Sequence, residues 1–555
     1  MSAGRPGDDD APGLDGPPKD EARGGARPGD HGPGRDQEGG RLEGEPDDDH
    51  RSVIEARTAW IAALAAVLLA ALFIPGPHDF PLDDAWIHLS YAKSVRLGDG
   101  PSYNPGDHEL GFSSPLWVAL LSVWPISGDP LRPVQLLGVL LHGLSAWIAA
   151  RLGLRLARAR ASAERPQPLS SLTVLTGVLV AASPGLVRAA TSGMEVSLTA
   201  AACLAVAWVV MFGRPGPAAL LGALAVWARP EALGFVVALA GVLAPWRWRA
   251  GRRGAPVWAP VAAAIGGLLA LGSWLVYCQV VAGQWWPNAQ YVKGEGGGLE
   301  GLDYLAQQVL PWQPWLVSLT GVVMLGLALR RDLIERRPEL LAVVVAALAT
   351  TVAIALSRPL HPGVLFYESR YFAPFVALPV VALPFGLPRA RPWLGWALVL
   401  PVAVVCGLQI DALHDRAQAQ RADTHQLHGA LAEQLADEGF PRDARVAVEG
   451  AGAPRFFAPR SMTIIDLVGL NDHELARRHD DVKAKLCHLV RSRPTHLAIP
   501  ADWIDAFTPV LALRPIARFD DPVYTQVDPP RALTLVLLAV DEIHPAWVEG
   551  CGRPE

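Results

Sequence analysis

Two adjacent carboxylates, Asp83 and Asp84, follow the first long apolar segment of the chain by a few residues. Carboxylates are costly near hydrocarbon and rarely lie there without a partner or a chemical role. One of them is a candidate general base for a hydroxyl group, because neighbouring like charges raise at least one of the two pKa values. The alternative is a solvated helix cap, since Asp favours the N-cap and a helical pattern follows at 85–97. These residues alone leave both interpretations open.

Cationic residues near the ends of later apolar segments are candidates for binding an anion. Arg229, Lys293 and Arg370 lie where a span would meet water, and guanidinium and ammonium groups bind phosphate there. The alternatives are an intramembrane pair with Glu231 for Arg229 and a helix-end anchor for Arg370. The residues close to these positions are candidates for substrate contact: His88, Glu195, Glu231, Asn288, Tyr291 and Tyr371.

Some of these candidates have structural explanations as well. Glu195 begins an apolar helical pattern, where a negative charge stabilises the helix dipole. His88 lies among aromatic residues, a setting in which a packed interfacial side chain is more common than a ligand. Trp117, Trp285 and Trp286 suit either the membrane interface or the face of a sugar.

The elements that must position these residues follow from the distribution of apolar residues. The chain has 555 residues, of which 51% are hydrophobic. Residues 1–57 are mainly Gly, Pro and charged residues, which predicts a disordered cytoplasmic head. Residues 58–410 contain repeated apolar runs of about 16–28 residues, long enough to span a bilayer. Residues 411–555 have a soluble composition, so the fold class is a polytopic α-helical membrane protein with a soluble tail.

Basic loops set the predicted orientation, because short cytoplasmic loops are enriched in Lys and Arg. The loops 151–165, 247–253 and 330–337 are basic and are placed in the cytoplasm. The N-terminus is then cytoplasmic, 76–130 is a long external loop that carries the paired aspartates, and the tail is extracytoplasmic. About 11 spans are predicted on length: 58–75, 131–152, 169–183, 194–212, 217–227, 231–245, 256–282, 314–330, 339–357, 371–387 and 393–410.

The same threading gathers the polar clusters on one side of the membrane. The paired aspartates and the clusters 188–195, 288–293 and 368–371 all fall on the external face. The apolar segment 114–126 is short for a span and is interpreted as a juxtamembrane or re-entrant helix. Polar residues from several loops that converge on one face are typical of a binding site.

The tail is predicted to be a small α/β domain, since strand-like runs alternate with helical ones. Of the five cysteines, Cys487 and Cys551 lie in this tail and can form a disulfide in an oxidising compartment. No basic surface indicates nucleic-acid binding. A helix is expected at 412–438 and strands at 445–449, 463–466, 496–499 and 532–540.

The loop 76–130 contains a run of motifs that resembles a known family. Asp83-Asp84 is followed by Tyr91-Ala, by Gly98-Asp-Gly100 with Tyr103-Asn-Pro-Gly106, and by Gly111-Phe-Ser-Ser-Pro-Leu-Trp117. This order resembles GT-C-type glycosyltransferases and, more narrowly, the bacterial branch with the terminal arabinofuranosyltransferases of actinobacterial cell walls. Further motifs of the family match in collinear order between residues 58 and 480: Thr191-Ser-Gly-Met-Glu195, Ala228-Arg-Pro-Glu231, Trp286-Pro-Asn288 with Tyr291-Val-Lys293, Glu368-Ser-Arg-Tyr371 and Asp466-Leu-Val-Gly-Leu-Asn-Asp472.

The resemblance implies an activity on the outer face of the bacterial plasma (inner) membrane. The donor would be a polyprenyl-phosphate sugar, the acceptor an envelope glycan, lipid or protein, and the reaction a single displacement with inversion. Asp83 or Asp84 would activate the acceptor, while the three cationic residues would hold the donor phosphate.

The resemblance leaves other points open. Some members use a divalent cation and others do not, so no cofactor is assigned beyond a cation that Asp83 or Asp84 would hold. Ala228, Ala289 and Gln290 depart from the family pattern, so the sugar and the acceptor are not fixed. Alternatives from other classes are a transporter or flippase for a lipid-linked sugar and a non-catalytic protein of envelope assembly.

Overall fold

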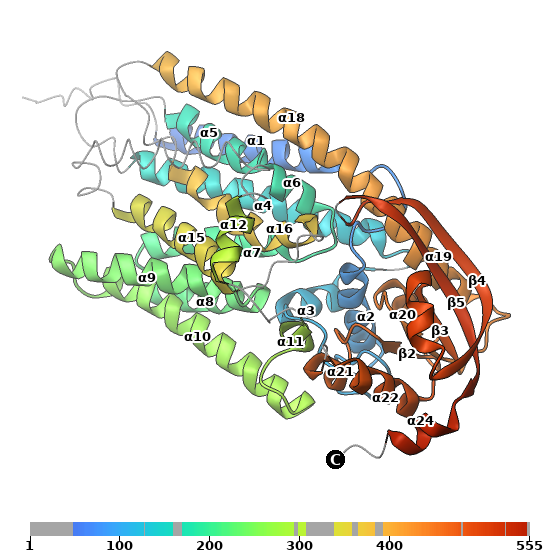
Figure 1. The fold of residues 1–555 in the computed structure, drawn as a ribbon. Coiled ribbons are helices and arrows are strands. Elements are labelled where there is room, and N and C mark those ends of the chain that lie inside the picture. Colours follow the sequence, from blue (N-terminus) through green and yellow to red (C-terminus); the bar gives the residue numbers. More distant parts are fainter. Residues whose placement is uncertain are drawn as a thin grey trace, which may run out of the picture. The chain divides into compact units, whose positions relative to one another are not determined.

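The computed structural model describes residues 48–126, 128–158, 169–292, 298–306, 338–357, 365–382, 392–478, 481–527 and 529–551. The predicted span 314–330, the basic loop 330–337 and Lys293 lie outside these residues. Figure 1 shows a bundle of long helices joined to a β-sheet with short helices. Residues 49–555 form one compact unit.

The bundle is built from helices whose sequences are almost uniformly apolar. Among the described residues, three helices are long and apolar enough to cross a membrane, namely Leu131–Arg155, Pro256–Ala282 and Pro338–Ser357. The bundle helices are α1 Asp48–Ala71, α4 Leu131–Arg158, α5 Leu169–Ala181, α6 Pro184–Ala190, α7 Val196–Met211, α8 Pro215–Ala228, α9 Ala232–Arg249, α10 Ala255–Ala282, α12 Leu299–Tyr304, α15 Pro338–Ser357, α16 Leu365–Val376, the 3-10 helix η3 Leu378–Ala382 and α18 Pro392–Thr424. Their length and composition are those of a membrane bundle, and the predicted number of spans stays a prediction.

Small residues let the helices of the bundle approach closely. A Cβ atom on Gly222 of α8 would lie 2.1 Å from the carbonyl oxygen of Ala263, and one on Gly266 of α10 would lie 2.0 Å from that of Ala219. Such small-residue contacts are the usual means of packing helices in lipid, where no hydrophobic driving force acts between them.

Some helix boundaries differ from the prediction. Helix α1 begins at Asp48 rather than at residue 58, so part of the expected disordered head is helical. The last predicted span and the first part of the helix expected at 412–438 are one continuous helix, α18, which runs through Gly407 without a break and ends at Thr424. Helix α16 begins at Leu365, ahead of the expected start at 371, and η3 follows it.

The loop between α1 and α4 folds into two helices, α2 Asp84–Arg96 and α3 Pro115–Val123. Helix α2 is buried over most of its length, including Trp86, His88 and Tyr91. Helix α3 has nine residues, which at 1.5 Å per residue gives about 13 Å, too short to cross a hydrocarbon core. The segment 114–126 is therefore not a span.

The C-terminal residues form a five-stranded mixed sheet in the order β2-β1-β3-β5-β4. Strand β1 pairs in parallel with β2 and β3, while β5 pairs antiparallel with β3 and β4. The sequence pattern missed β4, whose prolines and charges weaken the strand signal. The elements are the π-helix η4 His425–Gly429, α19 Ala430–Ala436, β1 Arg445–Val448, α20 Ala453–Phe457, β2 Thr463–Asp466, α21 His473–Arg477, α22 Val482–Ser492, β3 His496–Pro500, η5 Ala501–Trp503, α23 Ile504–Phe507, β4 Leu511–Tyr524, β5 Arg531–Ile543 and α24 Pro545–Gly550.

One hydrophobic core connects the loop helices, the bundle and the sheet. It includes Trp86 of α2, Trp117 of α3, Phe235 of α9 and Val448 of β1. Helix α2 packs directly on α20, as Figure 1 shows. The paired aspartates at the start of α2 are thus held between the bundle and the C-terminal residues.

Candidate active site

A small pocket, with a cavity volume of about 30 Å³, lies where the loop helix α2 meets the bundle and the C-terminal residues. Its walls come from segments that are far apart in the sequence. The lining residues are Asp84, Ile87, His88, Gly111, Ser113, Met194, Glu195, Arg229, Ala289, Arg370, Tyr371 and Leu470. The structure therefore brings together most of the residues that the sequence singled out.

Asp84 and Arg370 form an ion pair inside this pocket. Arg370 Nη2 lies 2.7 Å from Asp84 Oδ2, and both side chains are largely buried. The same nitrogen lies 3.3 Å from the hydroxyl of Tyr371, the next residue on α16. A buried charge needs such a partner, because removing it from water is expensive.

Arg229 is the second buried cation of the pocket, and two carboxylates balance its charge. Its guanidinium lies 3.2 Å from Glu195 Oε1 and 3.4 Å from Glu231 Oε2. It also donates to the backbone carbonyl of Arg370 at 3.3 Å and stacks over the ring of Tyr371. Arg229 thus fixes the start of α7 and the Arg370–Tyr371 step of α16 relative to each other.

The pocket contains two acceptor atoms that no described residue satisfies. His88 Nδ1 lies 3.0 Å from the backbone carbonyl of Asp84, so this nitrogen carries the proton and Nε2 is the acceptor of a neutral ring. Burial lowers the pKa of His88 despite the nearby carboxylates of Glu195 and Asp84, which favours the neutral ring. Within the described residues, His88 Nε2 and Glu195 Oε2 are buried without a hydrogen-bond partner. Because buried polar atoms are normally paired, both suit hydroxyl groups of a bound molecule.

Asp83 points away from the pocket, although it is adjacent to Asp84. Its carboxylate accepts hydrogen bonds from the backbone N–H groups of Gly452, at 2.6 Å, and Ala453, at 2.8 Å. A Cβ atom on Gly452 would lie 2.1 Å from the Asp83 carbonyl oxygen, so the approach requires glycine there. The structure therefore gives the two aspartates different surroundings, which their sequence positions alone did not reveal.

A buried histidine adjoins Asp83 on the side away from the pocket. His428 of η4 lies 3.8 Å from Asp83 Oδ1 and 3.5 Å from Glu449 Oε2. Burial alone would lower the pKa of His428, but the carboxylates of Asp83, Glu449 and Asp79 outweigh it and raise the pKa to about 9. The His428 side chain thus links Asp83 at the start of α2 to Glu449 in the C-terminal residues. No local sequence motif indicated a role for His428.

Asn288 and its neighbours form another wall. Asn288 is buried and donates to Glu109 at 2.8 Å, and its backbone N–H donates to the carbonyl of Leu110. The next residue, Ala289, lines the pocket. Tyr291, on α11 (Asn288–Val292), is partly buried and is not among the lining residues.

The motif 466–472 supplies the C-terminal wall of the pocket. The Asp466 carboxylate accepts from the backbone N–H groups of Val468, Gly469 and Asn471, which fixes a turn that presents Leu470 to the pocket. Asn471 in turn accepts a hydrogen bond from the hydroxyl of Tyr91 at 3.1 Å.

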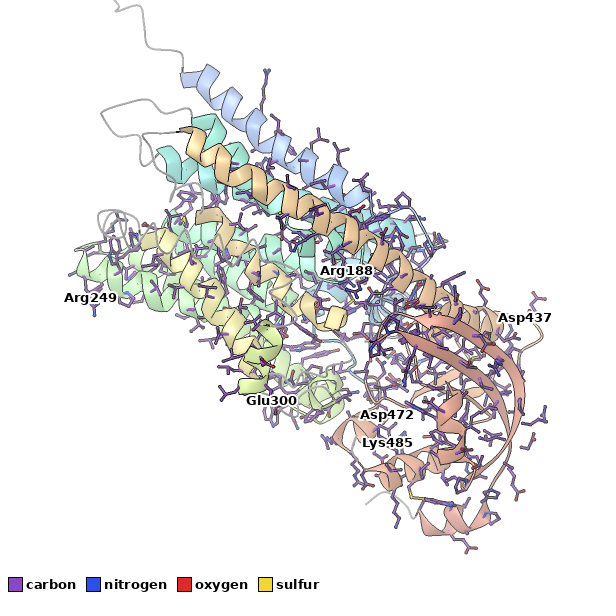
Figure 2. The ribbon with its side chains drawn as sticks, turned by 45° about the horizontal axis from the view of Figure 1, so that its top comes forward. Arg188, Arg249, Glu300, Asp437, Asp472 and Lys485 are labelled. Carbon is purple, nitrogen blue, oxygen red and sulfur yellow. A yellow bond between two sulfur atoms is a disulfide. The ribbon has the colours of Figure 1, made fainter. Side chains whose placement is uncertain are left out.

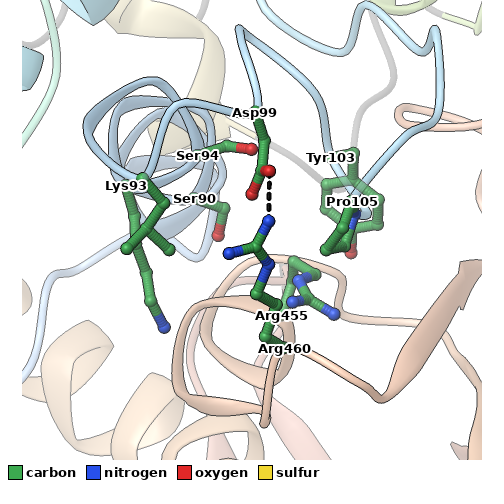
Figure 3. Close-up of a pocket in the computed structure, with 9 residues that line it drawn as sticks. Ser90, Lys93, Ser94, Asp99, Tyr103, Pro105, Arg455 and Arg460 are labelled. Carbon is green, nitrogen blue, oxygen red and sulfur yellow. Dashed lines mark hydrogen bonds and ion pairs between the residues drawn. The ribbon is translucent and has the colours of Figure 1, made fainter.

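Another face of α2 carries a second pocket of about 30 Å³ (Figure 3). Its cations are all engaged within the protein, and two of the contacts join the segment 84–99 to the C-terminal residues. Lys93 donates to the carbonyl of Phe456 at 2.6 Å, Arg455 donates to that of Met462, and Arg460 pairs with Asp99. Arg188, labelled in Figure 2, likewise contacts Gln420 on α18 rather than the main pocket.

The described residues of the main pocket offer no cluster of metal ligands. Among the described residues, no group of His, Cys, Asp and Glu side chains could hold a metal ion. Asp84 and Glu195 are instead each paired with an arginine.

Comparison with known proteins identifies the fold. Residues 411–529 match a family model described as a domain of unknown function, DUF8728. The sequence matches none of the curated proteins with which it was compared. The crystal structure of ArnT from Cupriavidus metallidurans in the apo state is 13% identical, with a TM-score of 0.58 over 92% of this chain and 100% of that one. ArnT bound to undecaprenyl phosphate is 12% identical, with a TM-score of 0.52 over 89% and 99%.

A more distant likeness involves a larger protein. The Archaeoglobus fulgidus oligosaccharyltransferase tethered with an acceptor peptide is 11% identical, with a TM-score of 0.49 over 82% of this chain and 70% of that one. The likeness to ArnT, which covers nearly the whole of both chains, shows that this chain has a GT-C-type membrane fold.

Proposed function

We propose that the chain is a membrane glycosyltransferase that moves a sugar from a polyprenyl-phosphate donor to a hydroxyl group of an envelope glycan, lipid or protein. The observation that carries this proposal is the Asp84–Arg370 pair in a pocket with two unsatisfied acceptor atoms. The fold supports it, since one of the similar ArnT structures is bound to undecaprenyl phosphate.

Asp84 is the proposed general base for the acceptor. It is the pocket-facing member of the aspartate pair, whereas Asp83 is bound to the backbone of α20. His88 Nε2 and Glu195 Oε2 accept hydrogen bonds from hydroxyl groups of the substrates and thereby orient them.

The proposed reaction is a single displacement. Asp84 takes the proton of the acceptor hydroxyl, and the oxygen attacks the anomeric carbon of the donor sugar. The new C–O bond forms as the bond from that carbon to the phosphate oxygen breaks. The electron pair of the broken bond leaves with the polyprenyl phosphate, whose negative charge increases by one.

Arg370 is the proposed stabiliser of the leaving phosphate. It shares the pocket with Asp84, so one guanidinium can contact both the base and the developing anion. Arg229, balanced by Glu195 and Glu231, is assigned a positioning role for Tyr371 and Arg370. Lys293 remains a candidate phosphate ligand on the basis of the family motif alone. Asn288 is assigned a positioning role, because its contact with Glu109 fixes the segment in which Ala289 lines the pocket.

We assign the pocket to the outer face of a bacterial plasma membrane, with the N-terminus in the cytoplasm. The Cys487–Cys551 disulfide supports an extracytoplasmic tail, because disulfides persist in oxidising compartments. The motif order in 76–130 and 466–472 resembles the arabinofuranosyltransferase branch, and the donor sugar is a pentose or a hexose.

The direct test is transfer by the purified, reconstituted protein. Labelled polyprenyl-phosphate arabinofuranose and hexoses are supplied with envelope glycan and lipid fractions, and products are identified by mass spectrometry. Transfer that is lost in Asp84→Asn supports the proposal. Movement of the labelled lipid across the vesicle without a product would instead show a flippase, and the absence of both transfer and movement would contradict the proposal.

A further inference from the structure

A polar cleft of about 480 Å³ lies outside the main pocket, between α21, α22 and Cys551 after α24. Four cationic side chains line it, namely Arg477, Arg478, Lys483 and Arg491. The cleft is cationic although the chain as a whole has a formal net charge of -6.

The two described carboxylates of the cleft are already used within the protein. Glu474 pairs with Arg491 and with His488, and Asp481 accepts from the backbone N–H of Ala484 as the N-cap of α22. Arg478 and Lys483 are exposed and form no ion pair with any residue that the structure describes. The cleft therefore presents positive charge that could meet an anion.

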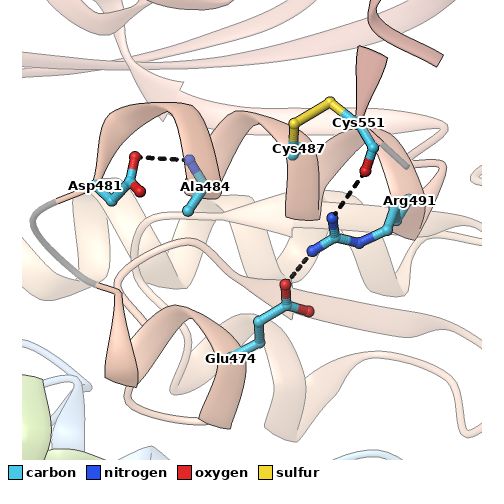
Figure 4. The surroundings of a disulfide bond; sticks show 6 residues. All are labelled: Glu474, Asp481, Ala484, Cys487, Arg491 and Cys551. Atoms are coloured by element: carbon cyan, nitrogen blue, oxygen red, sulfur yellow. Dashed lines mark hydrogen bonds and ion pairs between the residues drawn. A yellow bond between two sulfur atoms is a disulfide. The ribbon is translucent and has the colours of Figure 1, made fainter. Parts of the chain in front are cut away.

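The walls of the cleft are held in place by covalent and polar contacts, as Figure 4 shows. The Cys487–Cys551 disulfide joins α22 to the chain end. Arg491 extends from α22 to the carbonyl of Cys551 and to Glu474 of α21. A preformed cleft loses little entropy when a ligand enters, which favours binding.

A layer of residues in mutual contact, His473, Glu109 and Asn288, connects this cleft to the main pocket. His473 lines the cleft, and its backbone N–H and ring Nδ1 contact Glu109 at 2.7 and 2.6 Å. Glu109 also accepts from Asn288, whose neighbour Ala289 lines the main pocket. A chain-like acceptor lying in the cleft would thus extend over this layer towards Asp84.

We propose that the cleft is an acceptor subsite that binds an anionic stretch of a saccharide, through carboxylate or phosphate groups on its sugars. The proposal rests on the proposed glycosyltransferase function. It adds that the acceptor is a charged glycan, recognised at a distance from the bond that forms.

The test measures binding directly with a defined probe. Fluorescently labelled hexagalacturonate and the neutral maltohexaose are titrated into the full-length protein in detergent at low and high salt. The cleft variant is Arg478→Glu with Lys483→Glu. The matched control is Lys485→Glu, on the same helix and labelled in Figure 2, because positions two apart lie on opposite sides of an α-helix.

We expect the wild-type protein to bind hexagalacturonate but not maltohexaose, and we expect salt to weaken this binding. The affinity for hexagalacturonate should fall by about tenfold or more in the cleft variant and stay close to wild type in Lys485→Glu. Equal binding by the cleft and control variants would overturn the subsite. Absence of hexagalacturonate binding to the wild-type protein would also overturn it. If the cleft variant loses binding to phosphatidylglycerol vesicles but keeps binding to hexagalacturonate, the cleft is instead a contact with the membrane surface. The binding assay does not depend on sugar transfer. A failure of the subsite proposal therefore appears as lost binding specificity, whereas a failure of the proposed function appears as absence of a transfer product.

Discussion

Asp84 and Arg370 lie 286 residues apart in the sequence, and their side chains meet at 2.7 Å inside one pocket. The contact joins the start of a loop helix to a helix of the bundle. Its neighbour Asp83 instead binds the backbone of α20. The paired aspartates therefore divide into a carboxylate directed at the pocket and a carboxylate directed at the C-terminal residues.

This division predicts different outcomes for the two Asn variants. Asp84→Asn should lower the transfer rate by about 10²–10⁴-fold, since the general base is removed. Asp83→Asn should mainly lower the free energy of unfolding, by about 1–3 kcal/mol, because charge-assisted hydrogen bonds to Gly452 and Ala453 are weakened. Transfer assays paired with thermal unfolding in detergent check both. A folded Asp83→Asn protein that is as inactive as Asp84→Asn would contradict the assignment.

Replacing Arg370 should affect the donor more than the acceptor. Arg370→Lys keeps a charge but loses the planar guanidinium, so we expect the KM for the polyprenyl-phosphate donor to rise by about tenfold and kcat to fall. The KM for the acceptor should stay near the wild-type value. Initial rates at varied donor and acceptor concentrations separate these effects, and a change confined to the acceptor KM would exclude Arg370 from the phosphate site.

Metal removal should leave the reaction intact. The pocket carboxylates Asp84 and Glu195 are paired with arginines, and the charge that a cation would supply is already present. Transfer measured with excess EDTA is expected to remain within about twofold of the untreated rate. Inactivation by EDTA that Mg²⁺ or Mn²⁺ reverses would show that the substrates bring a metal into the pocket.

Local pattern in the sequence was sufficient for many elements. Helix α10 and strands β1, β2 and β3 lie within a residue or so of their expected bounds, because one long apolar run defines the helix and short β-branched apolar runs define the strands. Strand β4 was missed because its prolines and charged residues resemble a loop, and only pairing with β5 makes it a strand.

The surroundings of the site residues could not be predicted in the same way. Motif positions indicated that Asp84, Arg229 and Arg370 belong together, and the structure does place them in one pocket. The separation of Asp83 from the pocket depends on Gly452, 369 residues away, and the pairing of Arg229 with Glu195 depends on how α7 packs. Such contacts are set by tertiary packing, which leaves no local signal.

The close approach of the loop to the C-terminal turn predicts a steric effect at Gly111. A Cβ atom there would lie 1.9 Å from Asn471 Oδ1 and 2.6 Å from the Leu470 carbonyl. Gly111→Ala should therefore displace the turn that carries Leu470, lowering stability by about 1–3 kcal/mol and reducing transfer. The control Gly272→Ala, in α10 with nothing within 4 Å, should be neutral or slightly stabilising. Equal melting temperatures for both variants would contradict the close contact.

His428 predicts how stability depends on pH. Its pKa is about 9 in the folded protein, against an ordinary value of 6.5, because Asp83, Glu449 and Asp79 outweigh the opposing effect of burial. The folded state thus holds the proton more tightly than the unfolded state does. The resulting stabilisation, on the order of 3 kcal/mol, is complete below pH 6.5 and is lost as the pH rises through about 9.

The variant His428→Gln isolates this contribution from other titrating groups, including the nearby Asp79, whose pKa burial raises to about 7. Melting temperatures of wild type and variant should differ most at pH 6 and converge above pH 9, because only the protonated ring is attracted by the carboxylates around it. Thermal unfolding followed by tryptophan fluorescence at matched ionic strength gives both curves. A difference that is constant from pH 6 to 10 would mean that the neutral ring makes the stabilising contacts and that the ion pair with Asp83 contributes nothing.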